Sequence, residues 1–119
     1  MTKEELLDRT KNFALRTIKL VEALPKGATG SVLGRQLLRS GTSVGANYRA
    51  ACRGKSRADF LNKLKIVDEE CDESIYWMEL IEAANLIHSA KLKPLVAEAN
   101  ELVAIFVTAI RSTRENRKS

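Results

Sequence analysis

The chain has 119 residues, of which 45% are hydrophobic and 29% are charged, and it carries a net charge of +5. This length and balance predict one globular domain over residues 1–119 and exclude a disordered chain. No apolar run reaches the roughly 18 residues of a membrane span, and the charged N-terminus does not resemble a secretory signal, so we expect a cytoplasmic protein without membrane contact. Cys52 and Cys71 are far apart in sequence, which favours two reduced thiols over a zinc site or a disulfide.

Four segments show the periodicity of amphipathic helices, and none alternates in the manner of a strand. The first is expected over residues 3–24, with a capping box formed by Thr2 and Glu5. The second is expected to begin after an N-cap on Ser31 and to end at Gly54. A loop rich in proline and glycine separates the two segments.

The third and fourth segments complete the helical set. The third is the longest, and we expect it to run from an N-cap on Ser56, supported by Asp59, to about residue 87. The fourth opens near Pro94, and its polar, basic end at residues 112–119 is expected to fray. Four amphipathic helices with short connections predict an all-α fold, an up-down four-helix bundle.

Charge is segregated along the chain into two blocks of opposite sign. Residues 23–58 contain seven cationic side chains and no carboxylate. Residues 66–90 contain seven carboxylates and no Lys or Arg. Segregation of this kind favours partners of defined sign, either another copy of the chain or a polyanion.

The basic block lies mainly on the second expected helix. Gly54-Lys55-Ser56 resembles the end of a phosphate-binding loop, but that loop needs a glycine where Arg49 stands and a strand before it, so we exclude it. On a helical wheel, six positions share an inward direction: Leu33, Leu37, Ser40, Val44, Asn47 and Ala51. The amide of Asn47 is expected to make a structural hydrogen bond. Small residues on one flank allow another helix to approach closely: Gly41, Gly45 and Cys52.

A basic stripe faces outward on the same helix, and the connection that follows extends it. Its members are Arg35, Arg39, Arg49 and Arg53, followed in sequence by Lys55 and Arg57. Three interpretations remain open, namely contact with nucleic acid or another polyanion, pairing with acidic side chains of a neighbouring subunit, and a plain solvated surface. Tyr48 is the single aromatic residue beside the stripe, so we expect contact with the phosphate backbone rather than base stacking.

The third segment has two apolar sets. One set forms a bundle seam: Phe60, Leu64, Val67, Cys71, Ser74, Met78 and Ile81. A second set points away from that seam, with Trp77 between the two: Ile66, Tyr76, Leu80 and Ile87. A helix that is apolar on two sides is buried on two sides, which favours a homo-oligomer interface at these residues and at Trp77. The alternative is a helix that lies deep within its own bundle.

The acidic run at residues 68–73 raises the question of a di-iron site, which bundles build from glutamates and Glu-x-x-His motifs. The single histidine, His88, has Asn85 three residues before it, so the motif is missing. We therefore expect no metal, no cofactor, no catalytic residues and no enzymatic activity. His88 is expected to interact with the C-terminal dipole of the third helix.

Residues 33–81 resemble the small four-helix-bundle proteins encoded within intervening sequences of bacterial 23S ribosomal RNA genes, also labelled S23 ribosomal proteins. The residues that carry this resemblance are Arg39, Ser43, Ala46, Asn47, Tyr48, Arg49, Ala50 and Ala51, together with Glu73, Tyr76 and Trp77. The resemblance implies a homopentamer. The related accessory variability determinant of diversity-generating retroelements binds nucleic acid and a reverse transcriptase, which makes the basic stripe the analogous surface and a reverse transcriptase a candidate partner.

We therefore expect a non-enzymatic, homo-oligomeric four-helix bundle that binds nucleic acid, RNA in preference to DNA, through its basic helix surface. The candidate contact residues are Arg35, Arg39, Arg49, Arg53, Lys55 and Arg57. The alternative is a protein-interaction scaffold, in which the basic and acidic helices pair between subunits or with a protein partner.

Overall fold

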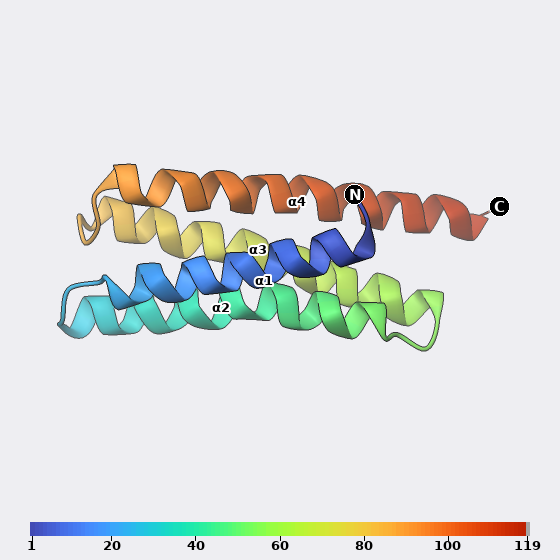
Figure 1. Ribbon diagram of the computed structural model, residues 1–119, viewed down its shortest axis with the longest axis horizontal. Coiled ribbons are helices and arrows are strands. Elements are labelled where there is room, and N and C mark those ends of the chain that lie inside the picture. The colour runs from blue at the N-terminus through green and yellow to red at the C-terminus, as the bar shows by residue number, and fades with distance from the viewer. Residues whose placement is uncertain (119) are drawn as a thin grey trace.

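The computed structural model describes residues 1–118 as four helices, and no strand occurs among them. These are α1 (Lys3–Glu22), α2 (Ala28–Cys52), α3 (Arg57–Ala83) and α4 (Ser89–Lys118). They run alternately up and down in an elongated bundle of 52 × 21 × 20 Å (Figure 1). Each helix packs against its neighbours in the chain, and α1 also meets α4, so the helices form a closed square. The expected all-α four-helix fold is confirmed.

The first turn of α1 is capped as its sequence predicts. The Oγ1 atom of Thr2 accepts a hydrogen bond of 3.1 Å from the backbone N–H of Glu5. The helix ends at Glu22, two residues earlier than its periodicity indicates. Along its buried side lie Leu6, Phe13 and Leu20.

The start of α2 differs from the prediction. The helix begins at Ala28 with Gly27 as its N-cap residue, and the backbone N–H of Ser31 donates to the Gly27 carbonyl at 3.0 Å. Ser31 is therefore inside the first turn, and the expected N-cap at this residue is wrong. The physical reason is the φ of +146° at Gly27, which only glycine adopts readily and which lets the chain turn sharply into the helix.

The two ends of α3 compare differently with their predictions. At its start, Ser56 Oγ accepts a hydrogen bond of 3.1 Å from the Asp59 N–H, as expected. At its end, the helix stops at Ala83, four residues before the expected position. Asn85 adopts a φ of +57°, and the next residue, Leu86, donates its N–H to the Ile81 carbonyl at 3.1 Å. This is a Schellman motif, in which asparagine takes the left-handed position that glycine usually fills.

α4 begins five residues before Pro94, so Pro94 lies inside the helix rather than at its opening. The start is fixed by His88, whose Nδ1 atom accepts a hydrogen bond of 3.1 Å from the Ala90 N–H. The expected role of His88 at the C-terminus of the third helix is therefore wrong, because α3 has already ended before His88. It caps the following helix instead.

The core is one continuous apolar cluster along the bundle axis. Phe13, Leu37, Leu64 and Phe106 are fully buried within it. Tyr48 is also buried, with its ring centroid 5.5 Å from that of Phe106, so its expected place beside the basic stripe is wrong. The wheel places Tyr48 on a flank, but its ring lies in the bundle interior, where it meets Phe106 of the diagonally placed α4. Most of the predicted inward residues are buried, and three are only half-buried: Leu33, Asn47 and Phe60.

Phe60 and Asn47 are two of these three half-buried residues. Phe60 is half-buried while the next residue, Leu61, is buried, so the α3 seam begins one position later than predicted. Asn47 is also half-buried, and its side-chain amide donates to the Ser43 carbonyl of its own helix at 2.8 Å. The expected structural hydrogen bond is confirmed, but it lies at the margin of the core.

The glycine-rich flank of α2 receives α1 closely, as expected. A Cβ atom on Gly41 would lie 2.6 Å from Cγ2 of Thr17, so no larger residue fits there without movement of the two helices. The Thr17 hydroxyl donates to the Phe13 carbonyl at 2.8 Å and is thereby satisfied within its own helix. The missing side chain at Gly41 is what allows this buried hydroxyl to fit against α2.

Candidate nucleic-acid interface

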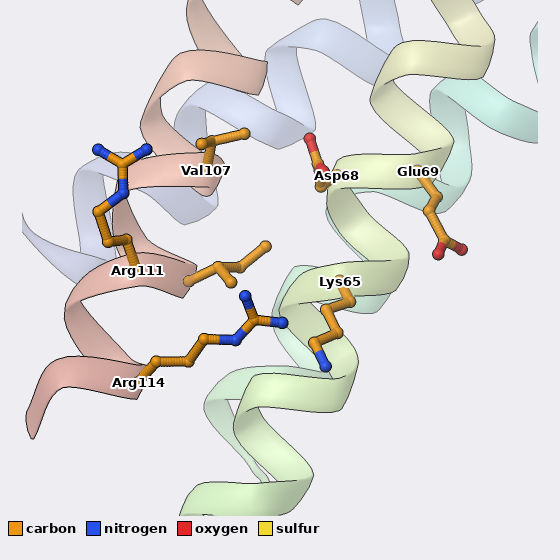
Figure 2. Close-up of a pocket in the computed structure, with 7 residues that line it drawn as sticks. Lys65, Asp68, Glu69, Val107, Arg111 and Arg114 are labelled. Carbon is orange, nitrogen blue, oxygen red and sulfur yellow. The ribbon is translucent and has the colours of Figure 1, made fainter. Parts of the chain in front are cut away.

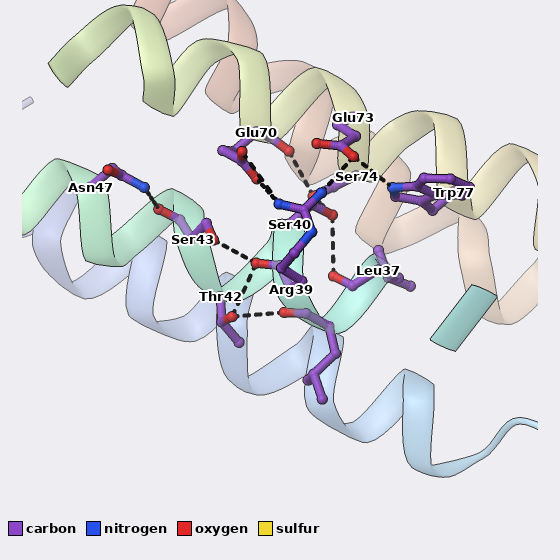
Figure 3. A network of polar contacts seen from close by, with 11 residues as sticks. Leu37, Arg39, Ser40, Thr42, Ser43, Asn47, Glu70, Glu73, Ser74 and Trp77 are labelled. Carbon is purple, nitrogen blue, oxygen red and sulfur yellow. Dashed lines mark hydrogen bonds and ion pairs between the residues drawn. The ribbon is translucent and has the colours of Figure 1, made fainter. Parts of the chain in front are cut away.

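Arg39, a member of the predicted basic stripe, is neutralised within its own chain. Its Nη1 atom lies 3.1 Å from Glu70 and its Nη2 atom 2.5 Å from Glu73, both on α3 (Figure 3). The hydrogen bond from Arg39 to Glu73 is the main reason that the pKa of Arg39 is raised, so the guanidinium remains charged at every accessible pH. Glu73 also accepts a hydrogen bond of 3.2 Å from the indole N–H of Trp77.

Two buried serines, one on α2 and one on α3, lie next to this ion pair in the core. The Ser40 hydroxyl, next to Arg39 in sequence, donates to the Leu37 carbonyl at 3.2 Å. Ser74 Oγ lies 2.9 Å from Ser40 Oγ and 2.9 Å from the carbonyl of Glu70 (Figure 3). The serines therefore satisfy each other where the apolar pattern is interrupted, and they fix the two helices at the level of Arg39.

Arg35 lies toward the other end of α2 from Arg49. The fourteen positions between them correspond to about 21 Å along a helix. Arg35 is exposed, and its guanidinium approaches the Ser31 hydroxyl at 3.4 Å. The structure therefore divides the stripe into three parts, because Arg39 is paired and Arg35 lies near the connection between α1 and α2.

The remaining candidates gather where α2 turns into α3. We name Arg49, Arg53, Lys55 and Arg57 the turn cations. All four are exposed, and none forms an ion pair with another described residue. Asp59 is the single carboxylate in the sequence between Arg49 and Lys65. The Asp59 carboxylate lies beside Gly54 but forms no ion pair with these cations, so no salt bridge among the described residues neutralises the positive charge of this short connection.

Arg57 lies at a position where helix stability disfavours a cation. Arg57 is the first residue of α3, where the helix dipole presents partial positive charge. A cation there is disfavoured by a few tenths of a kcal/mol, whereas Arg53 at the end of α2 is favoured by a similar amount. Local helix stability therefore explains Arg53 but does not explain Arg57.

A groove between α3 and α4 lies at the same end of the bundle (Figure 2). Its volume is about 360 Å³, and we name it the α3–α4 groove. Its lining residues are Lys65, Asp68, Glu69, Val107, Ile110, Arg111 and Arg114. Arg114 extends from α4 toward α3 on the side where Lys65 lies, whereas the carboxylate of Glu69 points away (Figure 2). Lys65 and Arg114 therefore approach each other at one part of the groove, whereas Arg111 extends along α4 beside Val107 (Figure 2).

The charges of this groove do not pair with one another. No ion pair joins Lys65, Arg111 or Arg114 to a carboxylate within the part of the chain that the structure describes. Burial, followed by the nearby charges of Asp72 and Glu69, raises the pKa of Asp68. A carboxylate held by a cation would show the opposite direction.

Arg9 is a second paired cation and serves as a reference. It donates two hydrogen bonds of 2.7 Å to Glu98 on α4 and one of 2.8 Å to Glu101. The hydrogen bond from Arg9 lowers the pKa of Glu98. Where this chain uses an arginine to join helices, as at Arg9 and Arg39, the guanidinium meets two carboxylates of the facing helix, unlike the turn cations.

The predicted oligomer interface is exposed in part. Tyr76 and Ile66 on α3 are 54% and 38% exposed. Trp77 and Leu80 are half-buried, and the Trp77 ring meets that of Tyr76 edge-on with centroids 5.1 Å apart. Ile87 is only 8% exposed and belongs to the core, so its expected outward position is wrong. The Schellman motif at the end of α3 changes the direction of the chain before Ile87, so that the Ile87 side chain packs into the core.

Sequence reasoning missed the contribution of α4 to the basic end. Arg111 and Arg114 stand far from the basic stripe in sequence, and the polar composition of the C-terminal residues predicts only a fraying tail. The signal was available, because an up-down bundle places the end of α2, the start of α3 and the end of α4 together. Arg111 and Arg114 lie on α4, within the range predicted to fray from residue 112 onward or directly before it.

Two searches of residues 1–118 give negative results. No group of three or more His, Cys, Asp or Glu side chains in this range is placed to hold a metal ion. Nor does any helix in this range combine the length and apolar character needed to cross a bilayer.

Comparison with known proteins identifies relatives of this chain. A model of the family described as 23S rRNA-intervening sequence protein matches residues 2–108. A crystal structure of a protein with unknown function from the S23 ribosomal protein family of Bacteroides thetaiotaomicron VPI-5482 superimposes with a TM-score of 0.87. The two sequences are 34% identical, and the match covers 93% of this chain and 99% of that chain. A search of curated proteins finds no match.

Proposed function

The chain belongs to the family of 23S rRNA-intervening sequence proteins, and on that premise we propose that it is a non-enzymatic protein that binds nucleic acid, RNA in preference to DNA. Family membership confirms the resemblance carried by the sequence. The contact surface in this proposal is the basic end of the bundle rather than the whole basic stripe. Phosphate groups of the nucleic-acid backbone are its ligands.

One observation carries the proposal, namely that the turn cations are exposed and form no ion pair with another residue that the structure describes. Arg39 shows that this chain can neutralise an α2 arginine with α3 carboxylates. No such ion pair forms at the turn cations among the described residues. Arg57 also stands at the N-terminus of α3, where the helix dipole disfavours a cation. Arginine donates two parallel hydrogen bonds to a phosphate, so three arginines and a lysine on one short connection fit a phosphate backbone.

We further propose that the protein assembles into a homo-oligomer, the pentamer that the family resemblance implies. Exposed Ile66 and Tyr76 support an interface on α3. Five chains of 13.2 kDa give a mass of 66 kDa, which light scattering coupled to gel filtration measures directly. A Tyr76→Glu variant is expected to shift the mass toward that of one chain. A monomeric wild-type protein would remove this part of the proposal.

The binding proposal is tested by fluorescence anisotropy with a fluorescein-labelled single-stranded RNA of twenty nucleotides. A variant with Arg49, Arg53, Lys55 and Arg57 all changed to Gln is expected to bind at least about 100-fold more weakly. Its salt slope should fall by about 2.8, because each neutralised phosphate of a single strand contributes about 0.7. Parallel titration with DNA of the same sequence measures the preference for RNA.

The matched control removes four exposed cations from the opposite end of the bundle. These are Lys19, Lys26, Lys91 and Lys93, each changed to Gln. The net charge of the control equals that of the turn variant, so a general electrostatic attraction would weaken both variants equally. Equal weakening, or failure of the wild type to bind RNA or DNA, would overturn the proposal.

The alternative function is a protein-interaction scaffold, and the exposed acidic side chains of α3 favour it. Asp72, Glu79 and Glu82 are exposed on the helix that also carries Tyr76. These residues could meet the turn cations of another subunit or the basic surface of a protein partner such as a reverse transcriptase. Loss of oligomer mass in the turn variant, without RNA binding by the wild type, would favour this function.

A further inference from the structure

The α3–α4 groove extends the basic end, and we propose that it holds one nucleotide of a single-stranded nucleic acid, with the phosphate between Lys65 and Arg114. This inference rests on the proposed function and names the form of nucleic acid and a second contact site. The strand would cross the end of the bundle from the turn cations to the last turns of α4.

The size of the groove sets the class of ligand. Its volume of about 360 Å³ lies at the small end of the range of roughly 300–1,000 Å³ that small-molecule ligands occupy. Such a space holds a single nucleotide rather than a double helix. A duplex contacts proteins through its grooves and its outer phosphates and keeps its base faces stacked inside.

The chemistry of the lining also favours an unstacked nucleotide. Val107 is 38% exposed in the groove, and Ile110 lines it as well, so an apolar surface stands beside the cations. Unlike a duplex, a single strand offers both a phosphate and an uncovered base face at one site. Arg114, as an exposed guanidinium, can donate to the phosphate or lie flat against the base.

The acidic residues of the groove do not oppose this placement. The carboxylate of Glu69 points away from the groove, and Asp68 lies nearer to Val107 than to the guanidinium of Arg114 (Figure 2). Neither carboxylate pairs with Lys65 or Arg114 among the described residues. The two cations are therefore available for a phosphate, while Asp68 can accept a hydrogen bond from a sugar hydroxyl or a base amino group.

The test measures binding of a fluorescein-labelled single-stranded RNA of fifteen nucleotides, alone and annealed to its complement. A Lys65→Gln/Arg114→Gln double variant is expected to bind the single strand about 10-fold more weakly, with a salt slope lower by about 1.4. Its affinity for the duplex should change less than 2-fold. The matched control is Lys91→Gln/Lys93→Gln at the other end of α4, which should leave both affinities unchanged.

A crosslinking experiment on the wild-type protein needs no substitution, so a folding defect cannot affect its result. RNA that carries 4-thiouridine is irradiated on the protein, and the attached peptides are mapped. We expect crosslinks to residues 107–114 in addition to those near the turn cations. Crosslinks confined to residues 49–57, or an unchanged affinity of the double variant for the single strand, would overturn the groove site but leave the proposed function standing. If the wild type binds no RNA, both proposals fail.

Discussion

Arg39 and Arg53 lie on the same outward face of α2, yet the charged side chains near them differ: Arg39 has carboxylates beside it, and Arg53 has cations. Arg39, near the middle of the helix, meets two carboxylates of α3 within 3.1 Å. Arg53, at the end of the helix, has no ion-pair partner among the described residues and is followed by Lys55 and Arg57. The difference follows from the antiparallel hairpin, because residues at equal distances from its turn face each other. Glu70 and Glu73 lie opposite the middle of α2, whereas no carboxylate among the described residues forms an ion pair with a turn cation.

This comparison shows that a single-sign stripe on one helix is not in itself a binding surface. The helix packed beside it decides which cations remain available. The following predictions test this division between the middle of the hairpin and its turn.

The two cysteines should differ most between these regions. Cys71 is fully buried in the middle of α3, where burial raises the pKa of its thiol to about 12, while Cys52 near the turn is half-buried. Labelling with a thiol-reactive disulfide at pH 8 should modify Cys71 on the order of 10³-fold more slowly than Cys52. The kinetics of Cys52→Ala and Cys71→Ala variants assign each phase. Equal rates would show that the middle of the hairpin opens as readily as its end.

The same thiol makes stability depend on alkaline pH. The Cys71 pKa is raised in the folded state from its ordinary value of 9.0, so the unfolded thiol ionises first as pH rises. The associated stability is present below about pH 9 and is lost progressively as the pH approaches 12. Urea unfolding at pH 8 and pH 10 should show a larger loss for the wild type than for Cys71→Ala. A loss of the same size in both would contradict the assignment.

Removal of one charge should weaken RNA binding at Arg53 but not at Arg39. We expect Arg53→Gln to weaken binding of single-stranded RNA about 3- to 10-fold, with a salt slope lower by about 0.7. Arg39→Gln should change the affinity less than 2-fold, because its charge is already neutralised by α3. Anisotropy titrations at several salt concentrations measure both quantities. Equal losses from the two variants would mean that the ion pair of Arg39 opens when RNA binds.

Removal of the carboxylates that pair with Arg39 should make this arginine available to RNA, as the turn cations are. In a Glu70→Gln/Glu73→Gln variant the guanidinium loses both partners, so affinity for the same RNA should rise about 3-fold. A Glu79→Gln/Glu82→Gln variant removes the same negative charge without releasing Arg39 and provides the control. An equal rise in both variants would attribute the gain to net charge alone.

The smallest expected effect is on folding stability. Arg39 is about half exposed, so Arg39→Ala should lower the free energy of unfolding by only about 0.5–1 kcal/mol. Arg53→Ala should change it by less than about 0.5 kcal/mol, since the side chain has no partner. Chemical denaturation of both variants measures the difference. A larger loss for Arg53→Ala would reveal a structural role at the turn.

Much of the fold could be predicted because local chemistry determines it. The caps at Thr2 and Ser56, the seam of α3 and the close approach at Gly41 all depend on residues within a few turns or on a simple helical face. The missed boundaries depend on backbone states that periodicity does not reveal. Gly27 and Asn85 both adopt positive φ values, and these decide where α2 starts and α3 ends.

The candidate site could be predicted only in part, for a different physical reason. Outward arginines follow from the wheel, but neutralisation of Arg39 depends on which residues of α3 stand opposite it, and burial of Tyr48 depends on α4. The α3–α4 groove joins Lys65 to Arg114, residues that only the packed bundle brings together. Pairing across helices requires the register between them, which no single segment of sequence contains.

The closed square of helices also has a consequence for the order in which the protein folds. Three of its four sides join helices that follow each other in the chain, and the side between α1 and α4 is the most sparsely packed. Local contacts of this kind favour folding in microseconds to milliseconds. The last side needs contacts between residues about ninety positions apart, and Arg9 with Glu98 provides them. We therefore expect the side between α1 and α4 to close last, when the Arg9–Glu98 pair forms together with the apolar contacts of α1 in the core.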